Sequence, residues 1–199
     1  MTAELHPIVQ VDISTPPPSW IALPPQPWPQ IVRLSAHTDE AGLALVAATL
    51  CSSGNSPAES PEALLDRLGP DLPGGIQVID GDREYVPGCC CSLEQWLWWR
   101  DVLEGGPSPW TGHVTAPLVE LQDDRVLIWS DGGEEGGPKP VDEDPVAMSR
   151  GEFTRALQGV GADIGAFLDR FHAWWLQRAP HHADAIVARL REINLDARN

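Results

Sequence analysis

Three consecutive cysteines, Cys89, Cys90 and Cys91, are the residues of this chain best suited to covalent chemistry. They precede Ser92, where we expect a helix to begin, and the positive end of a helix dipole lowers the pKa of a nearby thiol. If His113 acted as a base and Asp131 oriented it, Cys91, His113 and Asp131 would form the catalytic set of a thiol enzyme. The cysteine run matches no nucleophile motif, so this set is an alternative interpretation.

A zinc site is a second interpretation of the same segment. Thiolates at Cys89 and Cys91, joined by His113 or Cys51, would supply tetrahedral ligands. The chain has no CxxC and no His-x3-His pair, so such ligands would come from scattered positions. The third interpretation is structural, because small buried thiols would let a hairpin pack tightly on a tryptophan-rich helix. On balance we expect no cofactor, with zinc as the alternative.

Acidic side chains form a second candidate site. A hydrolase with paired carboxylates needs two acids on rigid elements, and a calcium loop needs EF-hand spacing. The acids here occupy turns and a loop rich in Gly and Pro, which favours an anionic patch that binds a partner. The residues of this patch are Asp123, Asp124, Asp131, Glu134, Glu135, Asp142, Glu143 and Asp144.

Nine tryptophans are available for packing or for binding. Trp96 and Trp99 are three residues apart and share the core face of a helix, whereas Trp98 points elsewhere. Because Trp174 and Trp175 are adjacent, we expect one of them to leave the core. Tryptophan is enriched among binding hot spots, so Trp98, Trp110 and Trp175 are the expected interface anchors.

The charge of the chain limits its partners. With 29 acidic against 13 basic side chains, the formal net charge is −16. Binding to nucleic acid or to anionic lipid depends on Lys and Arg, so both are disfavoured. A basic protein is the natural electrostatic partner, although an acidic surface also serves solubility alone. Without a secretory signal or a long apolar run, we expect no membrane span and a cytoplasmic location with reduced thiols.

Local patterns predict the elements that position these residues. Helices are expected at 38–51, from Ser60, from Ser92 to Gly105, from Ser149 to Pro180 and at 183–193, with capping boxes at Ser92 and Ser149. Strands are expected at 8–13 and 31–34, and hairpins at 76–86 and 118–129. Apolar residues at spacings of four and three, from Phe153 to Trp174, give the clearest helical pattern in the chain.

These elements predict a single α+β domain. Its antiparallel sheet combines both hairpins with the N-terminal strands, and the tryptophan helix and the long C-terminal helix pack against it. We assign residues 1–35 to a proline-rich N-terminal arm and residues 36–199 to the domain. Trp20 and Trp28 either fasten the arm over the core or belong to a polyproline ligand for another protein.

Three segments, PGCCCSLEQWLWWRDVL, PWTGHV and IWSDGG, resemble parts of uncharacterised acidic actinobacterial proteins over residues 75–178. By charge and size the chain also resembles bacterial immunity proteins, which are small, often acidic and non-catalytic. That resemblance implies a protein-binding module that neutralises a basic toxin. The alternative is a small metal- or thiol-dependent enzyme that uses Cys89–Cys91 with His113.

Overall fold

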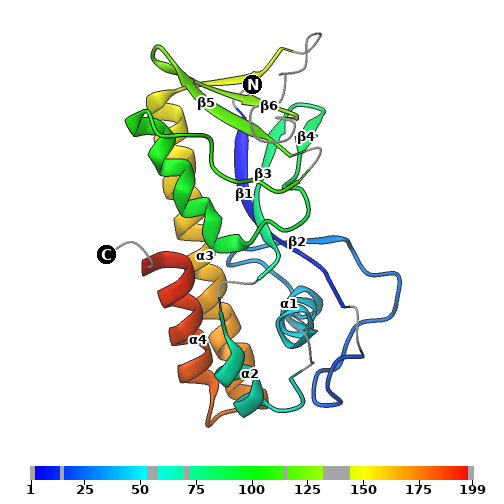
Figure 1. The fold of residues 1–199 in the computed structure, drawn as a ribbon. Coiled ribbons are helices and arrows are strands. Elements are labelled where there is room, and N and C mark those ends of the chain that lie inside the picture. The colour runs from blue at the N-terminus through cyan, green and yellow to red at the C-terminus, as the bar shows by residue number, and fades with distance from the viewer. Residues whose placement is uncertain are drawn as a thin grey trace.

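The longest element of the computed structural model is helix α3, Arg150–Arg178, which runs along one side of the molecule (Figure 1). The expected capping box sets its start: Glu152 N donates to Ser149 Oγ at 3.3 Å, and Ser149 N donates to Glu152 Oε2 at 2.9 Å. The predicted apolar stripe from Phe153 to Trp174 is buried. The structure describes residues 3–13, 16–52, 58–69, 72–113, 116–131 and 144–196.

The first sheet has the strand order β2-β1-β3-β4, with every neighbouring pair antiparallel. Its strands are β1 (Glu4–Gln10), β2 (Ile31–Arg33), β3 (Gly74–Asp80) and β4 (Arg83–Tyr85). The expected strand at 8–13 therefore lies a few residues earlier in the chain. Residues 1–35 contribute two strands of this sheet, and β1 is an interior one.

The second hairpin lies in a sheet of its own, so the prediction of one sheet from both hairpins is wrong. This sheet contains β5 (Leu118–Gln122), β6 (Arg125–Trp129) and β7 (Val146–Ser149) in that order. The sequence analysis did not predict β7. β7 pairs with β6 along the side away from β5, so β6 is the central strand of this sheet.

The remaining elements are helical: α1 (Glu40–Ser52), α2 (Pro61–Arg67), η1 (Leu93–Glu104), α4 (Ala183–Arg191) and η2 (Glu192–Asp196). The predicted α+β class is therefore confirmed. None of the helices in the described ranges has the length and the apolar character needed to cross a membrane.

The tryptophan-rich helix η1 (green in Figure 1) packs on β3, on β5 and on α3. Trp96 and Trp99 face the core, as their spacing predicted. The indole N–H of Trp96 is buried and donates to the backbone oxygen of Asn194 in η2 at 2.8 Å. A buried indole N–H usually finds such a partner, and this hydrogen bond joins η1 to the C-terminal segment.

The proline-rich segment 16–30 is held against the core by its tryptophans. Trp20 donates to the backbone oxygen of Glu59 at 3.1 Å, and its ring centroid lies 5.5 Å from that of Trp175. Trp28 is half-buried and donates to the backbone oxygen of Pro24 at 2.9 Å. These contacts favour fastening of the segment to the core over its use as a ligand for another protein.

The glycines of α3 supply a test of this packing. A Cβ on Gly161 would lie 3.0 Å from Cη2 of the buried Trp96, whereas one on Gly159 or Gly165 would meet nothing within 4 Å. Gly159→Ala and Gly165→Ala should each raise the free energy of unfolding by about 0.5–1 kcal/mol through helix propensity. Gly161→Ala should lower it, because the Trp96 ring must shift. Chemical denaturation measures all three changes; equal gains would contradict the close approach of η1 to α3.

Candidate functional site

The cysteine run lies between β4 and η1, where Cys89 and Cys90 form a turn. Cys90 has a φ of 64°, in the left-handed region that residues other than Gly, Asn and Asp rarely adopt. Both side chains are exposed. The turn therefore presents two adjacent thiols to solvent.

A second loop, residues 109–113, is hydrogen-bonded to this turn through its backbone. Gly88 N donates to Thr111 O at 2.8 Å, and His113 N donates to Cys89 O at 3.1 Å. These two bonds, made by residues more than twenty positions apart in sequence, fix the position of one loop relative to the other. They place His113 beside the cysteine turn.

Glycine is required on both sides of this contact. Gly112 has a φ of 107°, and a Cβ there would lie 2.5 Å from the carbonyl carbon of Gly88. A Cβ on Gly88 would lie 2.1 Å from the backbone oxygen of His113. Any larger residue at either position would push the loops apart.

The result is a cluster of three side chains, Cys89, Cys90 and His113, hereafter the thiol–imidazole cluster. The two Sγ atoms and one ring nitrogen all lie within 4.8 Å of one another, and the three residues are exposed. Cys89 Sγ is 3.8 Å from His113 Nδ1. Trp110 packs edge-on against the His113 ring at 5.0 Å, and its indole N–H donates to Cys90 O at 3.2 Å. The neighbouring thiol of Cys89 raises the pKa of Cys90.

Cys91 does not belong to this cluster, which corrects both the catalytic set and the zinc set expected from sequence. Its side chain is buried, and its Sγ lies 3.8 Å from the backbone oxygen of Trp110. Burial, together with the charge of Glu94, raises the pKa of Cys91 to about 12, so the expected lowering by the helix dipole does not occur. Cys91 is a structural thiol packed beside Gly75 of β3. Cys51 is also buried, and its pKa is raised to about 12.

The predicted acidic patch is described in part. Asp123 and Asp124 are exposed in the turn between β5 and β6, and Asp144 is exposed just before β7. Asp131 follows β6 and is half-buried. Four further members lie outside the described residues: Glu134, Glu135, Asp142 and Glu143.

The turn between β3 and β4 adds acids that the sequence analysis did not include. Arg83 forms an ion pair with Asp80, and its guanidinium also donates to the backbone oxygen of Asp144 at 2.7 Å. This contact brings the exposed Asp82 and Glu84 near the start of β7. Asp123 and Asp124 lie at the other end of the second sheet, beside the end of β7, so the two hairpins carry acids at opposite ends of this sheet. The sequence DGDRE predicts the turn between β3 and β4. Only the contact between Arg83 and the backbone of Asp144 shows that this turn lies beside a member of the acidic patch.

Arginines, by contrast, connect elements within the fold. Arg178 on α3 pairs with Glu40 at the start of α1, and Arg170 donates to the backbone oxygen of Thr38. Arg189 on α4 donates to the backbone oxygen of Leu68 at 3.3 Å. Further intramolecular contacts of this kind are made by Arg83, Arg150 and Arg191.

Of the three expected tryptophan anchors, only Trp98 projects into solvent, with 39% of its surface exposed. Trp110 is half-buried in the contact between the loops. Trp175 is 0% exposed, so the prediction that it anchors a partner is wrong. The physical reason is that Trp20, from the proline-rich segment, covers the side of α3 on which Trp175 lies.

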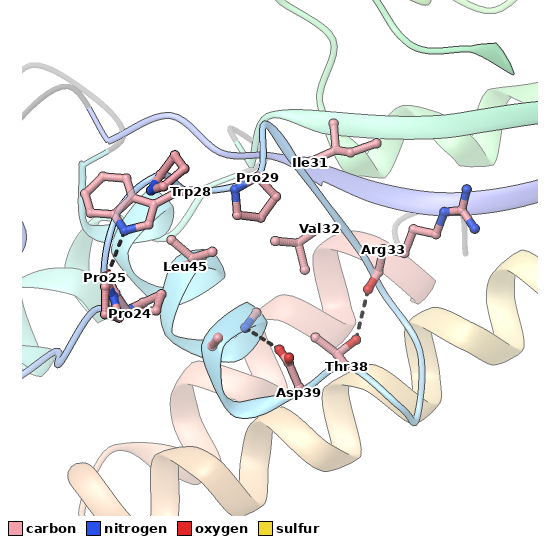
Figure 2. A pocket seen from close by; sticks show the side chains of 13 residues that line it. Pro24, Pro25, Trp28, Pro29, Ile31, Val32, Arg33, Thr38, Asp39 and Leu45 are labelled. Carbon is pink, nitrogen blue, oxygen red and sulfur yellow. Dashed lines mark hydrogen bonds between the residues drawn. The ribbon is translucent and has the colours of Figure 1, made fainter.

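A surface pocket of about 380 Å³ lies between the proline-rich segment, β2 and the start of α1 (Figure 2). Its walls are largely apolar and include Trp28 and Leu45. The polar groups at its edge bond within the chain: Asp39 Oδ1 accepts from Gly42 N at 2.8 Å, and Thr38 Oγ1 donates to Arg33 O at 3.0 Å. Asp39 rather than the expected Thr38 therefore bonds the first turn of α1. The polar groups of Thr38 and Asp39 are thus used within the fold.

Comparison of the chain with models of protein families, with curated proteins and with solved structures finds no match.

The different surroundings of the four cysteines predict two classes of thiol. In the native protein at pH 8, a disulfide reagent should modify Cys89 and Cys90 quickly, because both are exposed. Cys51 and Cys91 should react only after unfolding, since they are buried and their pKa is about 12. Absorbance of the released thiolate measures the rate of modification, and peptide mass spectrometry identifies the modified residues. Fast modification of Cys91 in the folded protein would contradict its assignment as a structural thiol.

Proposed function

We propose that this protein is a non-catalytic module that binds a basic protein partner, such as a toxin, and neutralises it in the cytoplasm. The observation that carries this proposal is that basic and acidic side chains have different places in the fold. Arginines such as Arg170 and Arg178 make contacts inside the fold, whereas Asp82 and Asp123 in turns, and Asp144 just before β7, are exposed to solvent. The chain has a net charge of −16, and these carboxylates are among those that face solvent.

An outward negative potential favours encounter with a basic surface. Electrostatic steering raises association rates by about ten- to a thousandfold at low ionic strength, and salt reduces the effect. Acids in tight turns suit this purpose, because a turn holds its carboxylates away from the protein body without burying them. The same potential repels nucleic acid and anionic lipid.

A lasting complex also needs an apolar anchor. Trp98 on η1 is the exposed tryptophan of the described residues whose side chain is free of core packing, and Trp is the residue type most enriched in hot spots. The free state of all four cysteines suits a reducing compartment, which supports the proposed cytoplasmic location. Because burial removes Cys91 from the surface, the catalytic set of Cys91, His113 and Asp131 has lost its nucleophile.

The test measures binding to the purified basic proteins encoded by the genes that flank this one, by calorimetry at low and at high salt. Neutralising four exposed acids, two in the β5–β6 turn, one in the β3–β4 turn and one just before β7, should weaken binding by more than about tenfold and flatten the salt dependence. Asparagine keeps the size of aspartate and tolerates the left-handed φ of 54° at position 123. The variant combines Asp82→Asn, Asp123→Asn, Asp124→Asn and Asp144→Asn.

A control variant removes the same number of charges from four acids elsewhere: one just after β1, one just before α2, one on α2 and one on α3. It combines Asp12→Asn, Glu59→Gln, Asp66→Asn and Asp163→Asn, and it should bind almost as the natural protein does. Equal losses in the two variants would show an effect of net charge alone. An affinity that salt does not change, or no binding to any basic protein tested, would overturn the proposal.

A further inference from the structure

The thiol–imidazole cluster carries donors that binding to a basic protein does not use. From the positions of Cys89, Cys90 and His113 we propose that the two thiolates and the imidazole bind a thiophilic d10 cation, Zn²⁺ in the first place. This site is independent of the acidic patch and of the proposed partner.

The donor types select this class of ion. Cysteine sulfur and histidine nitrogen are the preferred ligands of Zn²⁺, whereas Mg²⁺ and Ca²⁺ take oxygen. Bonds of about 2.3 Å to sulfur and 2.0–2.1 Å to nitrogen, at tetrahedral angles, place the ligand atoms about 3.5–3.8 Å apart. Cys89 Sγ and His113 Nδ1 are already 3.8 Å apart, and all three donors lie within 4.8 Å. Small side-chain rotations would complete the geometry.

The backbone holds these donors in place. The hydrogen bonds Gly88 N to Thr111 O and His113 N to Cys89 O join the two loops that carry the ligands. The glycine at position 112 allows this close approach. A site whose ligands are fixed by backbone contacts loses little conformational entropy when the ion binds.

The conformation of Cys90 is a second, independent observation. A non-glycine residue in the left-handed region is disfavoured, and such residues concentrate at functional sites. Glycine or asparagine would fit the turn better. The presence of a cysteine is explained if its thiol is needed beside the thiol of Cys89 and the imidazole of His113.

Because the three donors are exposed, the fourth tetrahedral position faces solvent. Water would occupy it, as at zinc sites that keep an open position.

The experiment titrates Zn²⁺ or Co²⁺ alone into the reduced full-length protein, freed of metal. We expect one equivalent to bind. Bound Co²⁺ should give the strong visible bands of a tetrahedral ion and the near-ultraviolet charge transfer of cobalt–thiolate bonds, and Zn²⁺ should displace it. Visible absorption reports the geometry of bound Co²⁺, and competition with a chromogenic chelator reports the affinity for Zn²⁺. Neither measurement needs the basic partner.

Three variants assign the ligands. Cys89→Ser and His113→Ala should each weaken Zn²⁺ binding by more than about tenfold. Cys90→Gly should lose the metal yet raise the melting temperature of the metal-free protein, because glycine relieves the left-handed φ. Loss of binding therefore cannot be attributed to misfolding in that variant.

His37→Ala and Cys51→Ala are matched controls, since they remove an exposed imidazole and a buried thiol outside the cluster. Both should bind Zn²⁺ as the natural protein does. Octahedral Co²⁺ spectra, no binding at micromolar Zn²⁺, or full affinity in Cys89→Ser would overturn the proposal. None of these results bears on the acidic patch, so this site and the proposed function can fail separately.

Discussion

Burial of one apolar stripe on α3 is the constraint on which the rest of the fold depends. The 29-residue helix is about 43 Å long, and β1 of the first sheet, β6 and β7 of the second, η1 and α4 all contact it. Neither sheet has more than four strands, so each depends on a helix to cover its apolar face. Gly161 shows how close this packing is, because Trp96 of η1 takes the space of a missing side chain. The position of η1 on α3 then determines where the cysteine turn lies.

The cysteine turn is held at both ends by backbone contacts. On one side Gly74 N donates to Cys91 O at 3.0 Å and Leu93 N donates to Leu72 O at 2.8 Å, which joins it to β3. On the other side the loop 109–113 carries His113 to it. The three adjacent thiols therefore differ in exposure. Cys91 is buried against β3 and inert, whereas Cys89 and Cys90 face solvent beside the imidazole of His113. The acidic turns lie on other elements, so the two proposed activities place separate demands on the surface.

Elements with strong local signals could be predicted from sequence. The capping boxes at Ser92 and Ser149 and the apolar stripe of α3 depend on residues at most a few turns apart, so η1 and α3 begin where expected.

Features that depend on residues far apart in the chain could not be predicted from sequence. The strand β7 has four residues and no turn signal of its own, and only pairing with β6 defines it. Which cysteine faces His113 depends on the φ of Cys90 and on the space beside Gly75. Trp175 is buried because Trp20 covers it, from 155 positions earlier in the chain.

The place of β1 in this architecture has a consequence for the order of folding. Its partner β3 begins at Gly74, and the helices that contact it, η1 and α3, begin at Leu93 and Arg150. Long loops must therefore close before the apolar side chains of β1 are paired and covered. Because contacts between distant segments form slowly, we expect the first sheet to be completed late in folding.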